Sequence, residues 1–415
     1  MTSAVAGTYS FTTFKIGKLD LTSSKLQVVD CNIYESAMDH HTYADVTVFD
    51  PADELGKNQI SGDEDVEIGI EVPGGQNPAN FKFKMLQNTD HRHQGALKAK
   101  TYTFHMCSPE LLKGQSTSVS KSWNKQSDEI VKDIVKDYWK SDKEVETEQT
   151  DSKTRIVGNN NPPHLVLDQL KDRHVSRENK ASAYTLFETR DDNGDQKFKF
   201  VTFENLMKNK SSSSQTYKHN PMMGAQSSTT GDDMWNIIEL NLPQTFNTMQ
   251  RWSSATNQST YCTASGKQQS KDIKYKDQEQ EFKYLGQSPV RKAEWDEVDK
   301  DKKPWRHTII DKANDKDKTK IAEMRSKKAA YMGRLLNDRG TMRIHGNPNL
   351  KVGDVIKIQI SSQSDDEEGN ESKQITAKVL IVNLRHNIGL PNQKPGPYTM
   401  IVEFIKAGYE ESVGG

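Results

Sequence analysis

The chain has 415 residues, with 57 Lys and Arg against 58 Asp and Glu, so its formal net charge is close to zero. This balance argues against a protein dedicated to nucleic-acid binding, which would carry a basic excess. Apolar residues make up 33% of the chain and the mean hydropathy is -0.86, which is polar for a globular protein. The length predicts about two to four domains, and the polarity favours an assembly subunit with long polar loops.

The three cysteines, Cys31, Cys107 and Cys262, are too few and too widely spaced for a disulfide framework. We expect them to be small core or surface residues of a protein that folds in reducing cytosol. No apolar run approaches the roughly 18 residues of a membrane span, and residues 1–11 lack the pattern of a secretory signal. We therefore expect synthesis in the cytoplasm and no membrane insertion.

Residues 1–120 are predicted to form a first tube-like β-barrel. Apolar residues alternate with polar ones over residues 66–72, 81–85 and 101–106, as they do in strands with one buried face. Several such strands in one stretch, with turn residues between them, favour a barrel or a sandwich.

Residues 121–205 are predicted to form an insert of helices and a β-hairpin. Ser127, which is followed by two acidic residues, has the pattern of a helix N-cap with an acidic first turn. Apolar residues then recur at helical spacing as far as Tyr138. Pro162 and Pro163 precede a second helix over residues 165–174.

The hairpin is the sharpest local pattern in the chain. An aromatic-rich strand over residues 183–188 is followed by the polar turn 191–195 and then by the alternating run 197–200. Asn193 and Gly194 are predicted to be the positive-φ pair of a two-residue turn. A calcium-binding loop is the alternative, but its glycine would come too early after the acidic residues. We therefore interpret Asn193 and Gly194 as structural turn residues that set strand register.

Residues 206–335 are predicted to be a polar, loop-rich region with short strands, because no sustained apolar period is visible there. Residues 336–415 return to β-structure and are predicted to complete a second tube-like barrel. Within them, Gly353 and Asp354 form a predicted structural turn, where glycine permits a bend or bulge before the next strand. The predicted fold class is α+β, mainly β, with two tube-like β-barrel domains, a small helical insert and long polar loops.

The sequence contains no phosphate-binding glycine loop, no zinc-protease motif and no serine-hydrolase motif. The pair His40 and His41 follows an acidic residue in a predicted loop, and His91 and His93 lie between two predicted strands. Neither group comes with the further ligands that a metal site needs, so we expect solvated histidines. We predict no catalytic, cofactor-binding or metal-binding residues, and therefore a protein that is not an enzyme.

The order of these elements resembles the baseplate hub proteins of contractile-tailed bacteriophages and, more distantly, the hub part of type VI secretion spike proteins. Three stretches carry the resemblance and together span most of residues 120–405. They are the helix start 127–134 with the later Pro-Pro helix, the hairpin 184–203, and the turn 348–356 with the strand 398–405.

This resemblance implies a homotrimer in which each subunit contributes two barrels to a pseudo-six-fold ring. Such a ring is a symmetry adaptor between a six-fold tail tube and a three-fold central spike protein. The resemblance also implies contacts with other baseplate proteins, a lumen for DNA or a tape-measure protein, and a place in the virion tail after assembly in the host cytoplasm. Two alternatives remain: a tail-associated peptidoglycan hydrolase, and a type VI-like spike hub, which predicts a long, repetitive C-terminal extension.

Overall fold

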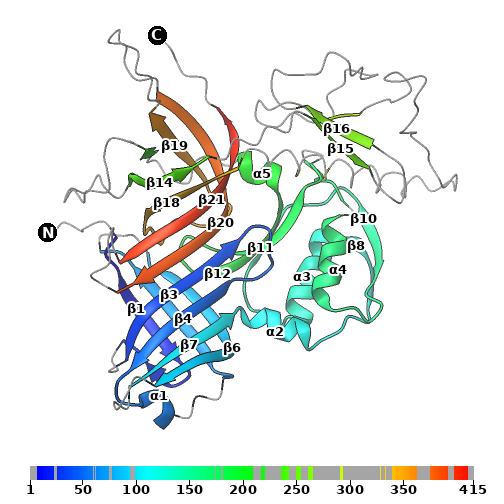
Figure 1. Cartoon of the computed structure of the whole chain (residues 1–415). Helices are drawn as coiled ribbons and strands as arrows, with labels where there is room; N and C mark the ends of the chain where they lie inside the picture. The colour runs from blue at the N-terminus through cyan, green and yellow to red at the C-terminus, as the bar shows by residue number, and fades with distance from the viewer. Residues whose placement is uncertain are drawn as a thin grey trace, which may run out of the picture.

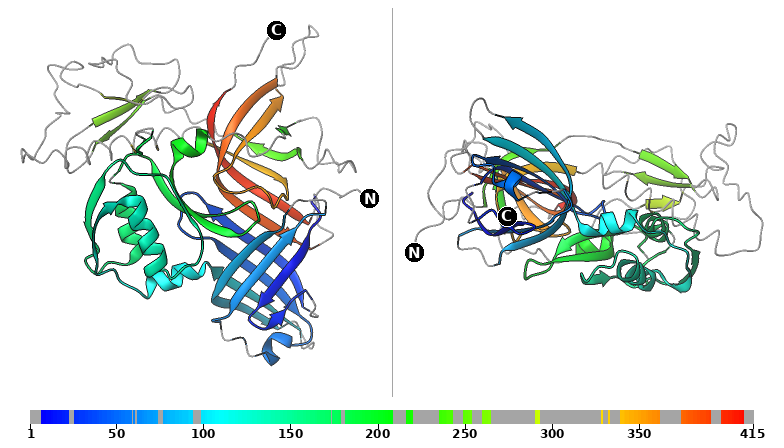
Figure 2. Two further views of the ribbon diagram at one scale, coloured as in Figure 1. Left: turned by 180° about the vertical axis from the view of Figure 1, so that it is seen from behind. Right: turned by 90° about the horizontal axis from the view of Figure 1, so that it is seen from below.

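The fold was obtained as a computed structural model of the chain. The residues it describes are 7–22, 26–58, 60, 62–73, 77–93, 99–172, 174–178, 181–208, 216–219, 235–242, 249–253, 260–264, 290–292, 328, 332, 339–361, 374–390 and 397–409. Within them, one curled sheet of 13 strands dominates (Figure 1). A smaller unit of helices and short strands lies to one side of it (Figure 2).

The N-terminal strands form the first curled half of the sheet, drawn in blue and cyan in Figure 1. Its neighbours run in the order β3-β4-β7-β6-β5-β1-β2, and every pair is antiparallel. The alternating residues of this half point their apolar members inward, because successive strand residues face opposite sides. The strands are β1 (Ser10–Ile16), β2 (Leu19–Asp20), β3 (Gln27–Ser36), β4 (Tyr43–Asp50), β5 (Asp65–Glu71), β6 (Ala79–His93) and β7 (Lys100–Cys107).

The C-terminal strands form the second curled half, drawn largely in orange and red. The order here is β14-β18-β21-β20, and β19 and β13 follow on from β20. A bridge between Lys218 and Asn236 brings β13 back beside the start of β14, so the half curls almost into a closed tube. The strands are β13 (Thr216–His219), β14 (Ile237–Asn241), β18 (Arg339–His345), β19 (Val355–Ser361), β20 (Gln374–Gly389) and β21 (Tyr398–Tyr409).

Strands β20 and β21 belong to both halves. The first part of β20 pairs with β19, whereas its last part, from Asn383 to Gly389, pairs with β3. An irregularity in the pairing with β21 lies between Ile381 and Asn383, where the strand changes partner. At the other edge, Tyr398 N donates to Gly7 O at 2.9 Å, just before β1 begins. The two halves are therefore joined by continuous backbone pairing, and one apolar core cluster fills them both.

The insert has its own apolar core, centred on Trp139 and the apolar faces of two helices. A two-stranded sheet of β8 and β10 and a three-stranded sheet of β9, β12 and β11 surround these helices. The elements are α2 (Pro109–Gln115), β8 (Ser122–Gln126), α3 (Ser127–Asp137), β9 (Val145–Thr147), β10 (Lys153–Val157), α4 (Pro163–Lys171), β11 (Tyr184–Arg190), β12 (Gln196–Thr202) and α5 (Phe203–Lys208).

The remaining described elements are the short helix α1 (Glu54–Lys57) and a three-stranded sheet of β15 (Met249–Ser253), β16 (Thr260–Ala264) and β17 (Val290–Lys292). These strands fall in the range 206–335, most of which lies outside the described residues. Among the described residues, none of the helices is long and apolar enough to cross a membrane.

The predicted N-cap at Ser127 is wrong. Helix α3 begins at Ser127, its N-cap is Gln126, and no side chain caps it. The buried Ser127 N–H donates instead to Thr150 Oγ1 at 3.1 Å, and Asp128 accepts from Thr150 N at 3.1 Å. The helix start is therefore satisfied by a residue 23 positions further along the chain, which a local pattern could not indicate.

The predicted fold class is confirmed: the molecule is mainly β, with a large curled antiparallel sheet and few helices. Cys31 and Cys107 are buried free thiols, as expected, and the side chain of Cys262 lies outside the described residues. The division of the chain into ranges 1–120, 121–205, 206–335 and 336–415 stays a prediction.

Candidate functional site

The turn between β11 and β12 is closed by the side chain of Asp191. Its Oδ1 atom accepts the N–H groups of Asn193 at 2.8 Å and Asp195 at 2.9 Å, and its carbonyl accepts Gly194 N at 3.3 Å. Gly194 has a φ of 89°, but Asn193 is not among the described residues with positive φ. The predicted two-residue turn with a positive-φ pair is therefore wrong. The loop is the longer kind, in which one left-handed glycine follows an ordinary turn.

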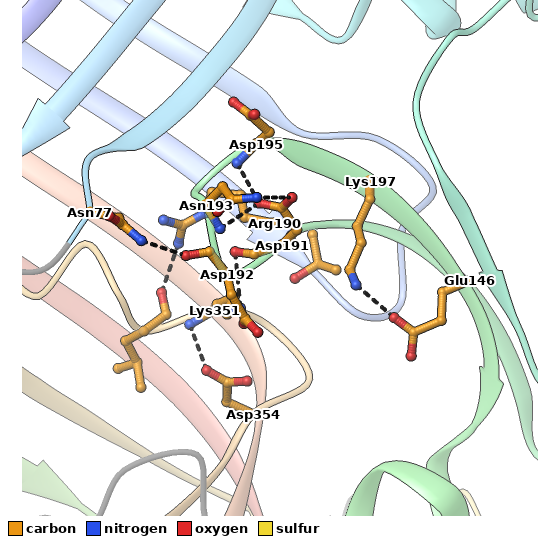
Figure 3. Close-up of polar contacts among 12 residues, drawn as sticks. Asn77, Glu146, Arg190, Asp191, Asp192, Asn193, Asp195, Lys197, Lys351 and Asp354 are labelled. Atoms are coloured by element: carbon orange, nitrogen blue, oxygen red, sulfur yellow. Dashed lines mark hydrogen bonds and ion pairs between the residues drawn. The ribbon is translucent and has the colours of Figure 1, made fainter.

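This turn is held against the first half of the sheet (Figure 3). Asn77 Nδ2 donates to Asp192 O at 2.8 Å, and Asn80 N donates to Gly194 O at 3.0 Å. A Cβ atom on Gly194 would lie 1.9 Å from Pro78 O, which is a backbone atom and cannot rotate away. Position 194 thus needs glycine both for its φ and for this close approach.

The same turn is held against the second half. Lys351 Nζ donates to Asp191 O at 3.0 Å and to Asp192 Oδ1 at 2.7 Å (Figure 3). Two residues before Asp191, Thr189 Oγ1 donates to Val352 O at 3.0 Å. The hairpin therefore bonds to both halves of the sheet through groups only a few residues apart. We call it, from Thr189 to Asp195, the clamp hairpin.

Arg190 is the buried centre of the clamp hairpin, and its side chain is 2% exposed. Its NH2 atom donates to Glu35 Oε1 on β3 at 2.9 Å and to Leu350 O at 2.7 Å, and NH1 donates to Pro348 O. A buried charge is tolerated only when it is paired and its donors are used, as they are here. One guanidinium thus ties the hairpin to the first half and to the turn that precedes β19.

Glu35 continues this network into the shared strands. Its Oε1 atom lies 2.8 Å from His386 Nε2 on β20, and His386 Nδ1 lies 2.6 Å from the Tyr398 hydroxyl on β21. Burial alone would raise the pKa of Glu35, but the Arg190 charge and the His386 hydrogen bond bring it below its ordinary value. Burial also lowers the pKa of His386, so the imidazole is neutral near pH 7.

The predicted turn at Gly353 and Asp354 lies beside the clamp hairpin. Gly353 has a φ of 90° and packs against Phe187, and its N–H donates to Ile381 O at 3.0 Å. Asp354 Oδ2 accepts Lys351 N at 3.1 Å (Figure 3). Burial raises the pKa of Asp354 to about 6. The structure therefore brings all four predicted turn residues, 193, 194, 353 and 354, to one junction, which the sequence did not indicate.

No group of three or more His, Cys, Asp or Glu in the described part of the chain is arranged to hold a metal ion. The Asp191 carboxylate, which lies in the turn considered as a calcium-binding loop, already accepts two backbone N–H groups of its own turn. The contacts of this junction fix the clamp hairpin against both halves of the sheet.

The expectation of solvated loop histidines is wrong for His40 and His41, which are 8% and 5% exposed. Both line a pocket of about 320 Å³ with Trp139 and residues of α2 and α4. The His41 and Trp139 rings lie 4.9 Å apart, and burial lowers the pKa of His41 to about 3. His91 and His93 lie within β6, and their side chains are outside the described residues.

No family model matches the sequence, and no curated protein matches it. Among solved structures, the fold is similar to that of a tail protein from Neisseria meningitidis MC58, with a TM-score of 0.53 and 9% identity over 96% of each chain. It is also similar to a chain of the lidded PdpA–VgrG complex of Francisella, with a TM-score of 0.51 and 11% identity. That match covers 98% of this chain and 55% of the other. At such identities the likeness shows the fold, and the fold expected from the resemblance is confirmed.

Proposed function

We propose that this chain, which has the fold of a phage tail protein and of a chain in a VgrG complex, is the structural hub of a tail baseplate. The observation that supports this most directly is the pair of curled halves, joined by β20 and β21 and fixed by the clamp hairpin. A chain with two such units at a fixed angle can present two similar edges to a ring-shaped partner. Its work would be to hold shape under load, which needs no catalytic group.

The finer form of the proposal is a homotrimer. Three chains with two tubes each would make a pseudo-six-fold ring, which matches a six-fold tail tube on one face and a three-fold central spike on the other. Its other partners would be further baseplate proteins, and the assembled hub would lie in the virion tail after assembly in the host cytoplasm.

Light scattering of the purified chain, alone and with the spike protein, tests the trimer. The expected mass is three times the chain mass of 47.0 kDa, or about 141 kDa, for the chain portion of the complex. A monomer under both conditions would contradict the proposal. An assay of the purified protein on isolated cell walls tests the alternative of a peptidoglycan hydrolase, and release of soluble fragments would support that alternative.

A lumen that passes DNA should have a wall without basic clusters, because Lys and Arg bind phosphates and slow passage. A cryo-EM structure of the assembled ring would show the wall, and a strongly positive inner surface would contradict DNA passage.

A further inference from the structure

A second buried charge cluster lies in the insert, next to the start of the clamp hairpin on β11, and it consists of Lys143, Glu110 and Glu188. Their side chains are 12%, 4% and 1% exposed. Lys143 Nζ lies 2.8 Å from Glu110 Oε2 and also contacts Glu188 Oε1. The ring of Phe198 covers the ammonium group, with its centroid 5.5 Å from Nζ. A single amine is therefore held between two carboxyl groups beside an aromatic wall.

The second oxygen of Glu188 faces hydrogen-bond donors. Thr42 N donates to Glu188 Oε2 at 3.0 Å, and the Ser108 hydroxyl donates to the same atom. On the other side of the cluster, Ser141 Oγ donates to Glu110 Oε1 at 2.6 Å. The carboxyl group of Glu188 thus has the Lys143 amine at Oε1 and two hydrogen-bond donors, Thr42 N and Ser108 Oγ, at Oε2. Donors so placed stabilise the negative charge that grows on an oxygen when a nucleophile adds to its carbon.

The charges of the cluster do not balance. One ammonium and two carboxylates leave one negative charge in a buried place, which disfavours the fully ionised state. Burial alone would lower the pKa of Lys143, but the charges of Glu188 and Glu110 raise it. Burial alone would raise the pKa of Glu110, but the charge of Lys143 lowers it. Lys143 and Glu110 are therefore held in their ionised forms at rest, and a proton passed from Lys143 to Glu110 gives the neutral amine as a minor form. A reaction that happens once per chain can proceed slowly through that form.

We propose that Lys143 and Glu188 condense to an intramolecular isopeptide bond, with Glu110 as the group that carries the protons. Nζ adds to the side-chain carbonyl carbon of Glu188, and the carbon–oxygen bond to Oε1 breaks with its electron pair on oxygen. Of the three protons on the ammonium group, one stays on the amide nitrogen and two leave with Oε1 as water. No electron is gained or lost, so the step needs no co-reactant.

Two physical effects favour the bond in this place. The fold holds the Lys143 amine in contact with the Glu188 carboxyl group, so the reaction does not have to bring two free groups together. The product also removes a buried ion pair, whose desolvation is costly, and puts a neutral amide in its place. Glu110 keeps its charge and its hydrogen bond to Ser141, so the net charge of the cluster is the same before and after.

The bond would join the loop before β9 to strand β11, across 45 residues of the chain. These residues include β10 and α4, which contribute part of the insert core. A covalent link of this kind restricts the unfolded chain in the same way as a disulfide does. It needs no oxidising compartment, which suits a chain whose described cysteines are unpaired.

Intact-mass spectrometry of the full-length folded protein tests the proposal. The expected mass is that of the sequence less one water molecule. Tryptic digestion should then yield one branched peptide that joins the segments around residues 143 and 188. Protein unfolded in denaturant directly from inclusion bodies should have the full mass and should lose water only upon refolding. A folded wild-type protein at full mass, with both segments recovered as linear peptides, would overturn the proposal.

Two variants locate the chemistry. Lys143→Arg keeps the positive charge but removes the amine, and Glu110→Gln keeps the size but removes the proton carrier. Both are expected at full mass. Lys197 and Glu146, which form a more exposed pair at 2.7 Å on the neighbouring strands, serve as the internal control and should appear only in linear peptides. Loss of water in Lys143→Arg would contradict the assignment, and if a variant fails to fold, the wild-type mass still decides.

Discussion

The two halves of the large sheet are joined by backbone pairing and a shared apolar core, whereas the insert is joined to them through strand β11 and a buried ion pair. The halves share β20, β21 and a continuous apolar core, so backbone pairing and burial both hold them together. The insert has a separate core, and strand β11, buried on both faces, serves both. Leu186 packs in the insert core, whereas Phe187 packs in the core of the large sheet. At the end of the strand, Arg190 forms a buried ion pair with Glu35 of the large sheet. We call the Arg190 ion pair and its hydrogen bonds the polar link. Because hydrogen bonds are directional, the polar link fixes the position of the insert against the sheet, which apolar contacts alone would not do.

The largest effect is expected when this polar link is cut. Arg190→Met leaves Glu35 as a buried charge without its cation and frees two backbone carbonyls, which should lower the free energy of unfolding by about 3–5 kcal/mol. Urea denaturation at pH 7 measures it. Lys197→Met, which breaks the more exposed pair with Glu146, is the matched control and should cost at most about 1 kcal/mol.

Should the two variants lose similar stability, the buried network would not be what holds the insert. The double variant Arg190→Met, Glu35→Gln sharpens the test, because it removes the orphaned charge. It should recover part of the loss.

A smaller effect is expected at the glycine that touches the first half. Gly194→Ala adds the strain of a left-handed alanine and a clash with Pro78 O, so the loss should be about 2 kcal/mol or more. Gly62→Ala is the matched control, since Gly62 has a φ of 95° with open space around its Cβ position. That variant should show only the strain, about 1 kcal/mol. Thermal melts with and without a chelator compare them, and a chelator effect on the wild type would reveal a metal site instead of a turn.

At Gly353, where the nearest atom to a new Cβ is the Phe187 ring at 3.0 Å, the expected loss lies between these two values. A side chain can move aside more easily than a backbone carbonyl. Gly353→Ala should therefore cost about 1–2 kcal/mol, measured by the same melts. A loss larger than that of Gly194→Ala would mean that the second half, and not the first, limits the fit of the clamp hairpin.

The smallest effect is a gain. Because burial raises the pKa of Asp354 to about 6, the folded state binds a proton more tightly than the unfolded chain does. This group therefore lowers stability as pH rises from about 4 to 6, and the loss is complete above pH 6. Asp354→Asn cannot ionise and should be more stable than wild type by about 1–3 kcal/mol at pH 7, with the difference vanishing near pH 4. Denaturation midpoints across this range measure it, and a pH-independent difference would contradict the ionisation argument.

The sequence predicted the parts of the molecule whose causes are local. The strand alternation near Val66 and the glycine at position 194 depend on neighbours in the chain, and both lie where they were expected to matter. Arg190 was missed because its partner Glu35 is 155 residues away, and nothing in the run Glu-Thr-Arg marks it as buried. His41 was misjudged for the same reason, since Trp139 and helix α4, which line its pocket, come roughly 100 residues later or more.

Because strands β20 and β21 belong to both halves, the first half of the sheet cannot be completed until the end of the chain has been synthesised. The first half of the sheet begins at β1, yet its strand β3 pairs with β20, where His386 comes 351 positions after its partner Glu35. Gly7 O, just before β1, also accepts the N–H of Tyr398 in β21. During synthesis, the edge of β3 that pairs with β20 therefore stays unpaired until β20 is made. The insert can already fold by then, because its contacts are closer in sequence. An open strand edge is a site for wrong pairing with other chains. We therefore expect nascent chains that stop before residue 383 to bind chaperones or to aggregate, and the final strands to end that exposure.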